Sequence, residues 1–354
     1  MKITESDFLN TPQTDKEIVE AQYLSVKAEV GLPSNAAFMI AIPKGWKYEP
    51  EYQERLPGPE NPVIPLASFK STDQSAVKGM TDAVIVLWAV FLPREMHGAD
   101  WLEIWMLSQG FSKIAGRQAG SVYGLMGDVL ATRNADGKEM MHRMFTVKDG
   151  DILYLIDGRV VNRTDLNAIA AQEVFLLAAT HFKLLQPTKE MYAEGVHFIT
   201  LEGRISYEFL FSGLWDKQVV DDAPRDGACL LFSNRSGDQI IGNMIALSGS
   251  YNDKIDALQQ TTLSKLSNQG FEIDEKAQPL SNLDSKEKSI QVLKHDALKD
   301  GNDYDMMVAR ILIKDFPVLI VLVTPQKQMS YEIWAVNRRA FEIAVGSIKP
   351  IAKR

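Results

Sequence analysis

The chain has 354 residues, of which 45% are hydrophobic and 24% are charged, a balance typical of a folded globular protein. Its net charge of −8 and pI of about 5.3 argue against a nucleic acid or an anionic membrane as partner, because no basic stripe offsets the general repulsion. The length exceeds what one ordinary core fills and therefore predicts two domains.

The N-terminus is polar and lacks the apolar segment of a secretory signal. The longest apolar run, residues 83–92, is about half the length that a bilayer requires. The single cysteine, Cys229, cannot form an internal disulfide, so the fold does not depend on an oxidising compartment. We interpret Cys229 as a core residue, with a reactive thiol as the alternative. These features predict a cytoplasmic protein without a membrane-spanning segment.

The first half predicts an antiparallel sheet with two helices after an N-terminal extension. Its expected elements are strands at 37–42, 66–70 and 83–92, a helix at 99–109, strands at 111–116, 122–132, 140–147 and 152–157, and a helix at 164–185. Gly110 is the expected C-terminal cap of the first helix, and Thr164 is the expected N-cap of the second. Hairpin turns are expected at 134–137 and 148–151. Runs of strands bracketed by helices indicate the α+β class.

The second half repeats this order. Its expected elements are strands at 206–211, 228–233 and 240–247, a helix at 252–268 capped by Gly270, strands at 271–275, 289–296, 306–313 and 318–323, and a helix that begins at Ser330. Residues 282–288 are expected to form a charged loop.

Short sequence matches between the halves indicate a duplication. FMIAIPKGW ends at Trp46 and YEFLFSGLW ends at Trp215, an offset of 169 residues. LSQGF and SNQGF place Gly110 and Gly270 at an offset of 160 residues. Matches in the same order at nearly constant offset predict a tandem repeat. We expect an extension over 1–35, repeats over 36–187 and 196–354, and a linker over 188–195.

The order of elements resembles that of the photosystem II PsbP proteins and their bacterial relatives. The first strand ends in Pro43-Lys44-Gly45-Trp46, similar to the Pro-x-Gly-Trp of that superfamily, whereas Ser212-Gly213-Leu214 precedes Trp215 in the second half and matches more loosely. The resemblance implies two tandem PsbP-like domains. It also implies a non-catalytic role, because superfamily members include assembly factors, a regulator of the nuclear import GTPase, and bacterial chaperones that hold type VI secretion effectors.

The sequence contains no recognisable catalytic or cofactor motif. None of the five histidines has the spacing of a helical metal pair, and no phosphate-binding glycine loop or nucleophile elbow occurs. We therefore expect no metal, no organic cofactor and no enzymatic activity. The alternative is an enzyme with a divergent pocket that uses residues such as Asp221, Asp222 or His142. Glu173 and His181 share one face of the 164–185 helix, where a structural hydrogen bond is favoured over a functional pair.

Two apolar helix faces are candidate contact surfaces. Trp101 and Trp105 lie on one stripe of the 99–109 helix, for which core packing is favoured and a partner-facing patch is the alternative. Phe175 and Phe182 lie on a second apolar face of the 164–185 helix. We expect the second domain to cover them, or, if they are exposed, a bound protein partner.

The continuously apolar strands at 83–92, 152–156 and 318–323 also indicate that both faces of each sheet are covered. We expect packing of the two domains to cover the second face, with a hydrophobic groove for a partner as the alternative. Together these features favour a protein-binding chaperone or adaptor, whose cargo could be a secreted effector or an assembly component. A structural subunit of a larger assembly is the alternative. The oligomeric state stays open.

Overall fold

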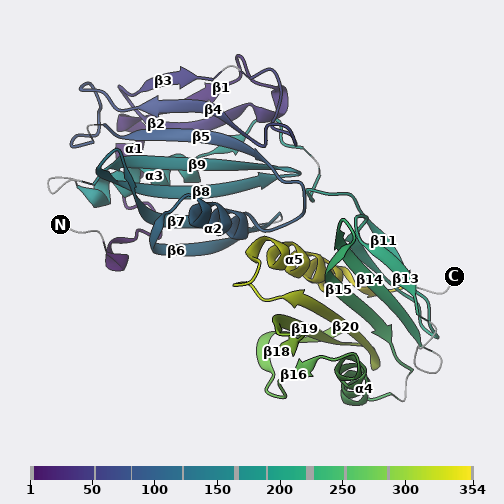
Figure 1. Ribbon diagram of the computed structural model, residues 1–354. Helices are drawn as coiled ribbons and strands as arrows, with labels where there is room; N and C mark the ends of the chain where they lie inside the picture. The colour runs from purple at the N-terminus through teal and green to yellow at the C-terminus, as the bar shows by residue number, and fades with distance from the viewer. Residues whose placement is uncertain are drawn as a thin grey trace. The chain divides into compact units, whose positions relative to one another are not determined.

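A computed structural model describes residues 4–51, 53–80, 82–121, 123–162, 167–188, 190–220, 227–250, 253–284 and 288–351 (Figure 1). The chain divides into two compact units, Met1–Ala193 and Glu194–Arg354. Every pairing between the described strands is antiparallel, and helices pack on the sheets in both units. The expected α+β class is confirmed.

The first unit contains a seven-stranded sheet of order β3-β4-β5-β9-β8-β7-β6 and a three-stranded sheet of order β1-β2-β10. Its elements are η1 (Glu5–Asp7), α1 (Lys16–Gln22), β1 (Tyr23–Ala28), η2 (Ser34–Ala36), β2 (Phe38–Pro43), β3 (Lys47–Pro50), β4 (Val63–Lys70), β5 (Val84–Phe91), α2 (Gly98–Ser108), β6 (Ser112–Ser121), β7 (Gly124–Ala135), β8 (Lys138–Asp149), β9 (Ile152–Val161), α3 (Ala168–Thr180) and β10 (Lys183–Leu184). Helix α3 contacts both β2 of the small sheet and β8 and β9 of the large one, whereas α2 contacts β7 and β8.

The second unit contains an eight-stranded sheet of order β13-β14-β15-β20-β19-β18-β16, in which β17 also pairs with β18, and a three-stranded sheet of order β11-β12-β21. Its elements are β11 (Val196–Leu201), β12 (Tyr207–Ser212), β13 (Asp216–Val219), β14 (Ala228–Ser236), β15 (Gln239–Ser248), α4 (Ile255–Asn268), β16 (Glu272–Ile273), β17 (Gln278–Asp284), β18 (Lys288–Lys299), β19 (Asn302–Ile313), β20 (Phe316–Pro325), α5 (Tyr331–Ser347) and β21 (Lys349–Pro350). Helix α5 contacts β12 and β20, whereas α4 contacts β19 and β20.

The expected glycine caps are confirmed. Gly110 and Gly270 follow the ends of α2 and α4 with φ of 70° and 94°, a left-handed conformation that glycine adopts without steric cost. The expected hairpin at 134–137 is also present, since Asp136 and Gly137 have φ of 51° and 74° between β7 and β8. Positive φ at both central residues is the requirement of a type I′ turn.

The helix expected at 164–185 is shorter in the structure. Helix α3 begins after Asn167, whose side chain accepts a hydrogen bond from the Ala170 backbone N–H, and it ends at Thr180. The expected cap Thr164 lies outside the described residues. Helix α3 ends early because Lys183 and Leu184 become extended and pair with β2. Part of the loop expected at 282–288 is strand, since β17 extends to Asp284 and β18 begins at Lys288.

The described part of the expected extension over 1–35, residues 4–35, supplies part of the first unit. Strand β1 pairs with β2 along its whole length, from Tyr23 opposite Pro43 to Ala28 opposite Phe38. Leu9 belongs to the same buried core cluster as Tyr23, Ala28 and Phe38. In the segment expected as a linker, Thr188 donates to the Asp149 carboxylate and the Ala193 backbone N–H donates to Glu95, so both are held within the first unit.

The continuously apolar strand β9 is covered on both faces within the first unit. Tyr154 and Ile156 belong to the core cluster that contains α3 residues, and Leu155 belongs to a second cluster with Leu102 and Met106 of α2. Alternate residues of β9 therefore face different helices. The expectation that domain–domain packing covers the second face of this sheet is corrected accordingly.

The half-buried carboxylate of Glu49 on strand β3 gives a prediction for acid stability. Hydrogen bonds from Lys47 and Lys70 lower the pKa of Glu49 to about 2, from an ordinary value of 4.5. A carboxyl whose pKa is lower in the folded chain contributes stability that is present above the unfolded pKa and is lost as the pH falls toward the folded one. Glu49→Gln is therefore expected to lower the urea midpoint at about pH 6 and to match the wild type near pH 2. An equal deficit at both pH values would contradict this role of Glu49.

Candidate protein-binding surface

Helix α2 lies on the large sheet of the first unit through its buried side. Leu102 and Met106 are 0% and 4% exposed and contact the face of the sheet formed by Val129 and Met144. Gly127 of β7 permits the close approach, because an ideal Cβ there would lie 2.8 Å from Leu102 Cδ2. Burial of Leu102 and Met106 sets the rotation of α2 about its own axis. This rotation determines which side chains of α2 point away from the sheet.

The two tryptophans of α2 lie at the edge of this buried contact. The Trp101 and Trp105 rings stack with centroids 5.9 Å apart and planes 13° from parallel, and both residues are half-buried. Trp105 also contacts Phe111, whose ring centroid lies 5.2 Å away. The Arg133 guanidinium lies 5.3 Å from the Phe111 centroid, a cation–π distance. The indoles therefore form an ordered row rather than loose surface side chains.

Apolar residues continue from this row onto the solvent side of α2. Leu107 is 67% exposed, and Ile104 is half-buried. We call Trp101, Ile104, Trp105, Leu107 and Phe111 the α2 patch. It combines rigid aromatic rings with an exposed aliphatic edge, a combination that marks contact surfaces in soluble proteins. Both rings pack against the core cluster of α2 and the sheet, as favoured from the sequence, and both stay half-buried, so the partner-facing alternative for Trp101 and Trp105 remains a prediction.

Helix α4 of the second unit has polar residues at the corresponding positions. Adding the offset of 160 residues between Gly110 and Gly270 aligns Trp101 with Thr261, Ile104 with Ser264, Trp105 with Lys265, and Leu107 with Ser267. All four residues of α4 are exposed. The α2 patch is therefore a property of the first unit and not a requirement of this helix position.

Phe175 and Phe182 do not form an exposed surface. Phe175 is 1% exposed and lies directly over Gly158 of β9. Phe182 is 8% exposed, and its ring centroid lies 5.7 Å from that of Phe38 and 5.9 Å from that of Tyr154. The expectation that the second domain or a partner covers them is corrected: the large sheet and β2 of the small sheet bury them within the first unit. Sequence periodicity reveals a covered face but not the element that covers it.

Of the candidate catalytic residues, His142 has a structural partner. His142 Nδ1 lies 2.8 Å from Asp157 Oδ1, both residues are buried, and the His142 ring contacts Phe111 edge-on at 4.9 Å. Asp157 thus orients the His142 imidazole, which packs against Phe111 of the α2 patch. Asp221 and Asp222 lie outside the described residues. Glu173 and His181 do not pair with each other.

Glu173 instead accepts the backbone N–H groups of Gln13 and Thr14 at 2.8 and 2.7 Å. His181 Nδ1 lies 2.9 Å from the carbonyl oxygen of Leu177. Glu173 and His181 therefore each form hydrogen bonds with backbone groups of the chain itself and not with each other.

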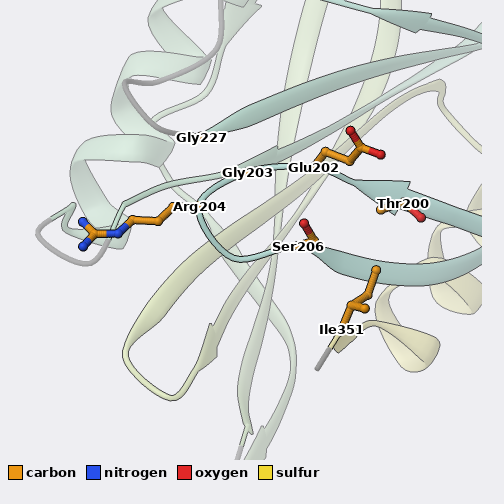
Figure 2. A pocket seen from close by; sticks show the side chains of 7 residues that line it. All are labelled: Thr200, Glu202, Gly203, Arg204, Ser206, Gly227 and Ile351. Atoms are coloured by element: carbon orange, nitrogen blue, oxygen red, sulfur yellow. The ribbon is translucent and has the colours of Figure 1, made fainter. Parts of the chain in front are cut away.

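An open pocket of about 840 Å³ lies in the second unit at the turn between β11 and β12 (Figure 2). It is lined by Thr200, Glu202, Gly203, Arg204, Ser206, Gly227 and Ile351. The side chains of Glu202 and Arg204 point in different directions, so the pocket does not gather them into one acid–base pair (Figure 2). No group of three or more His, Cys, Asp or Glu residues in the described ranges could hold a metal ion.

These features define an α+β protein with mostly antiparallel sheets and an apolar patch on one helix. None of its described helices has the length and apolar character needed to cross a bilayer. No protein-family model matches the chain, and no curated protein matches it.

Solved structures show weak likenesses. Cyanobacterial PsbP (CyanoP) from Synechocystis sp. PCC 6803 is 15% identical, covers 41% of this chain and 86% of its own, and has a TM-score of 0.30. The immunity protein TplEi of T6SS from Pseudomonas aeruginosa is 11% identical, covers 87% of this chain and 97% of its own, and has a TM-score of 0.22. TplEi complexed with "L" peptide is 11% identical, covers 86% and 98%, and has a TM-score of 0.20.

Proposed function

We propose that this chain is a non-catalytic protein-binding chaperone or adaptor, built from two tandem PsbP-like repeats and active in the cytoplasm. The observation that carries the proposal is the α2 patch, in which Trp101 and Trp105 stack on each other and Leu107 of the same helix is exposed. Tryptophan is enriched among the residues that dominate protein interfaces, because its large rigid ring buries much apolar area at little entropic cost.

The order of the strands supports the repeat. In each large sheet, three strands that are consecutive in the chain (β3-β4-β5 or β13-β14-β15) are followed by the last strand before the unit's final helix, β9 or β20. The remaining strands then follow in reverse chain order, β8-β7-β6 or β19-β18-β16. In each unit the small sheet joins two early strands to a short strand after the last helix. Trp46 and Trp215 follow the corresponding strands β2 and β12 at the same distance. Ser212-Gly213-Leu214 replaces the Pro-x-Gly that precedes the tryptophan in the first repeat, as expected if the second repeat has diverged in sequence.

The composition of the α2 patch indicates the class of partner. Its five members are all apolar and offer rings and aliphatic groups but no carboxylate, hydroxyl or imidazole. A patch of this kind recognises an apolar segment of another protein, such as an amphipathic helix of a secreted effector or an assembly component. The absence of an acid–base or nucleophilic group among these five residues is the reason for proposing binding without catalysis.

Leu107→Ser combined with Trp105→Ala is expected to weaken binding of an apolar helical peptide at least about a hundredfold, because the two truncations together are expected to cost about 3 kcal/mol or more. Binding would be measured by isothermal titration calorimetry with the full chain and a synthetic amphipathic helix. Lys265→Ala with Ser267→Ala, which changes the residues of α4 aligned with Trp105 and Leu107, is the matched control and is expected to leave the affinity unchanged.

Affinity purification from the native organism completes the test. The wild type is expected to retain a stoichiometric protein that the Leu107→Ser/Trp105→Ala variant loses, while urea unfolding shows that the variant remains folded. Equal peptide affinity for the variant and the wild type would contradict the proposed role of the α2 patch. Retention of the same stoichiometric complex by the variant would favour a structural subunit that assembles through another surface.

A further inference from the structure

A polar groove lies in the second unit between α4 and the segment that follows β16, and we call it the α4 groove. It has a volume of about 750 Å³, within the range of ligand sites. Helix α4, β16 and β18 lie together in this unit (Figure 1). The lining residues from α4 lie on one face of the helix: Asp256, Gln259, Gln260, Leu263, Ser264, Ser267 and Asn268. Residues 273–275, His295 of β18 and Arg310 of β19 complete the lining.

The segment opposite α4 is held on β18 by backbone pairing and by one side chain. Ile273 pairs with Ala297 in the ladder between β16 and β18. The Asp274 backbone N–H donates to the carbonyl oxygen of Asp296 at 2.8 Å. His295 Nδ1 lies 2.9 Å from the carbonyl oxygen of Asp274, and because a carbonyl oxygen only accepts, Nδ1 is the donor. The groove is therefore bounded by regular elements and by a segment that is fixed on one of them.

His295 brings an unpaired acceptor to the α4 groove. The residue is 4% exposed, and its Nε2 atom is buried without a hydrogen-bond partner among the described residues. Since Nδ1 carries the hydrogen that Asp274 accepts, Nε2 of the neutral imidazole can only accept. A buried acceptor without a partner costs free energy, which a donor group of a ligand would recover. His295 therefore indicates a ligand that donates a hydrogen bond.

The charge of the α4 groove is negative. Its twelve lining residues include three carboxylates and one guanidinium. The guanidinium, Arg310, forms an ion pair with Asp256. Asp274 Oδ1 accepts the backbone N–H of Lys276 at 2.9 Å, and in the part of the chain that the structure describes neither Asp274 nor Glu275 pairs with a cation. Two carboxylates without a cationic partner, in the same groove as an acceptor that needs a donor, are complementary to a primary ammonium group.

The other end of the α4 groove offers an unpaired donor. Arg310 Nη1 donates to Gln291 Oε1 at 3.0 Å and Nη2 donates to Asp256, whereas Nε is buried without a partner among the described residues. His295 lies opposite Met306, four residues along β19 from Arg310, which corresponds to roughly 13 Å at about 3.3 Å per residue. A ligand that reaches both ends therefore needs an acceptor, such as a peptide carbonyl, at some distance from its ammonium group.

We propose that the α4 groove binds an extended peptide segment through a primary ammonium group, which a free amino terminus or a lysine side chain presents. The ammonium donates to His295 Nε2 and is attracted by the Asp274 and Glu275 carboxylates, while a carbonyl oxygen of the peptide accepts from Arg310 Nε. A segment of about four or five residues spans this distance. The neutral polar residues of the lining can pair with its other backbone groups: Gln259, Gln260, Ser264, Ser267 and Asn268. The site is independent of the α2 patch, since it belongs to the other unit and uses different residues.

Short serine–alanine peptide amides are the probes: one with a free amino terminus, one acetylated, and one acetylated with a central lysine. Saturation-transfer difference NMR with the full chain measures the affinity of each. We expect saturable binding of at least one ammonium peptide and at least about tenfold weaker binding of the neutral acetylated peptide, because only an ammonium group gains charge-assisted contacts. Comparison of the two ammonium peptides identifies the source of the group. Binding of the neutral peptide as tightly as both ammonium peptides, or binding of none, would overturn the proposal.

Asp274→Asn combined with Glu275→Gln removes the negative charge at two exposed positions and is expected to weaken the ammonium peptide about tenfold. Glu272→Gln is the matched control, since Glu272 is an exposed carboxylate of β16 that does not line the groove, and it is expected to leave the affinity unchanged. Undiminished binding by the double variant, or an equal loss in the control, would overturn the assignment to this groove.

His295→Asn tests the buried acceptor. The asparagine amide keeps a donor for the Asp274 carbonyl but has no group in place of Nε2. It is expected to weaken the ammonium peptide about tenfold while circular dichroism and urea unfolding show a folded chain. Unchanged affinity in the folded variant would overturn the assigned role of His295, and if the variant does not fold, the Asp274→Asn/Glu275→Gln variant decides. The Leu107→Ser/Trp105→Ala variant is expected to bind the ammonium peptide as the wild type does, which separates this site from the α2 patch.

Discussion

Arg143→Met is expected to destabilise the first unit by about 3–5 kcal/mol, because it breaks a buried charge pair by removing one partner. Arg143 lies on β8 and is 0% exposed. Its Nε and Nη2 donate to the two carboxylate oxygens of Asp128 at 3.1 and 3.0 Å, a bidentate pair. Methionine fills similar volume but leaves the buried Asp128 carboxylate with Arg117 as its remaining cationic neighbour.

The same guanidinium also holds the N-terminal segment. Arg143 Nη1 donates to Gln172 Oε1 at 3.1 Å, and Nη2 donates to the carbonyl oxygen of Leu9. Gln172 in turn donates to the carbonyl oxygen of Asp7 at 2.8 Å. The guanidinium lies 4.5 Å from the centroid of the Phe8 ring. Loss of Arg143 is therefore expected to release the segment before α1 as well as to weaken the sheet.

Hydrogen-exchange mass spectrometry on the full chain resolves these effects, since it reports each unit by its own peptides. Arg143→Met is expected to speed exchange in peptides of residues 4–51 and of β7 and β8. Arg235→Met, which removes an exposed pair with Asp216, is the matched control and is expected to cost less than about 1 kcal/mol. Adding Asp128→Asn to Arg143→Met is expected to restore part of the loss, because the buried carboxylate, which then has Arg117 as its cationic partner instead of two arginines, is replaced by a neutral amide. Equal destabilisation by the two arginine variants would contradict the buried network.

Local sequence signals predicted the helices α2, α4 and α5, most of the long strands and the turn at 134–137, but they did not predict helix α1 or the strands β1, β3, β11, β13 and β17. Asp136-Gly137 and the glycines at 110 and 270 require conformations that few other residues adopt, so their positions could be read without knowledge of the tertiary structure. Apolar periodicity likewise indicated that α3 is covered on two sides. These signals depend on neighbouring residues alone, which is why a single sequence contains them.

Long-range partners could not be predicted in the same way. Leu9 and Arg143 are 134 residues apart, and no periodic pattern links a backbone carbonyl near the N-terminus to a guanidinium on β8. The α2 patch was found in part: Trp101 and Trp105 stood out by their size, whereas the 67% exposure of Leu107 depends on how α2 is rotated against the sheet. The sequence alone does not show whether a single leucine is buried or exposed. The alignment with Ser267 is the signal that could have distinguished it.

Gly158→Ala is the second substitution with a large expected effect. Gly158 lies on β9 between Ile85 of β5 and Arg143 of β8. An ideal Cβ at this position would lie 2.8 Å from Phe175 Cβ and closer still to the ring. Phe175 is 1% exposed in the core, so its ring cannot move aside without shifting α3. Overpacking of this kind typically costs about 1–3 kcal/mol, and we expect the upper end because the ring is rigid.

Phe175→Ala is expected to cost about 3–5 kcal/mol through the cavity that it leaves. The double variant Gly158→Ala/Phe175→Ala is expected to lose less than the two single losses combined, because the new methyl group occupies part of that cavity. Gly120→Ala on β6 adds the same methyl group where no neighbouring atom lies within 4 Å and is expected to change stability by about 0.5 kcal/mol or less. Urea unfolding of the full chain, with hydrogen exchange to assign the loss to the first unit, measures all four variants. Strictly additive losses would mean that the Phe175 ring does not rest on Gly158, and the packing of α3 on β9 would then differ from the one described.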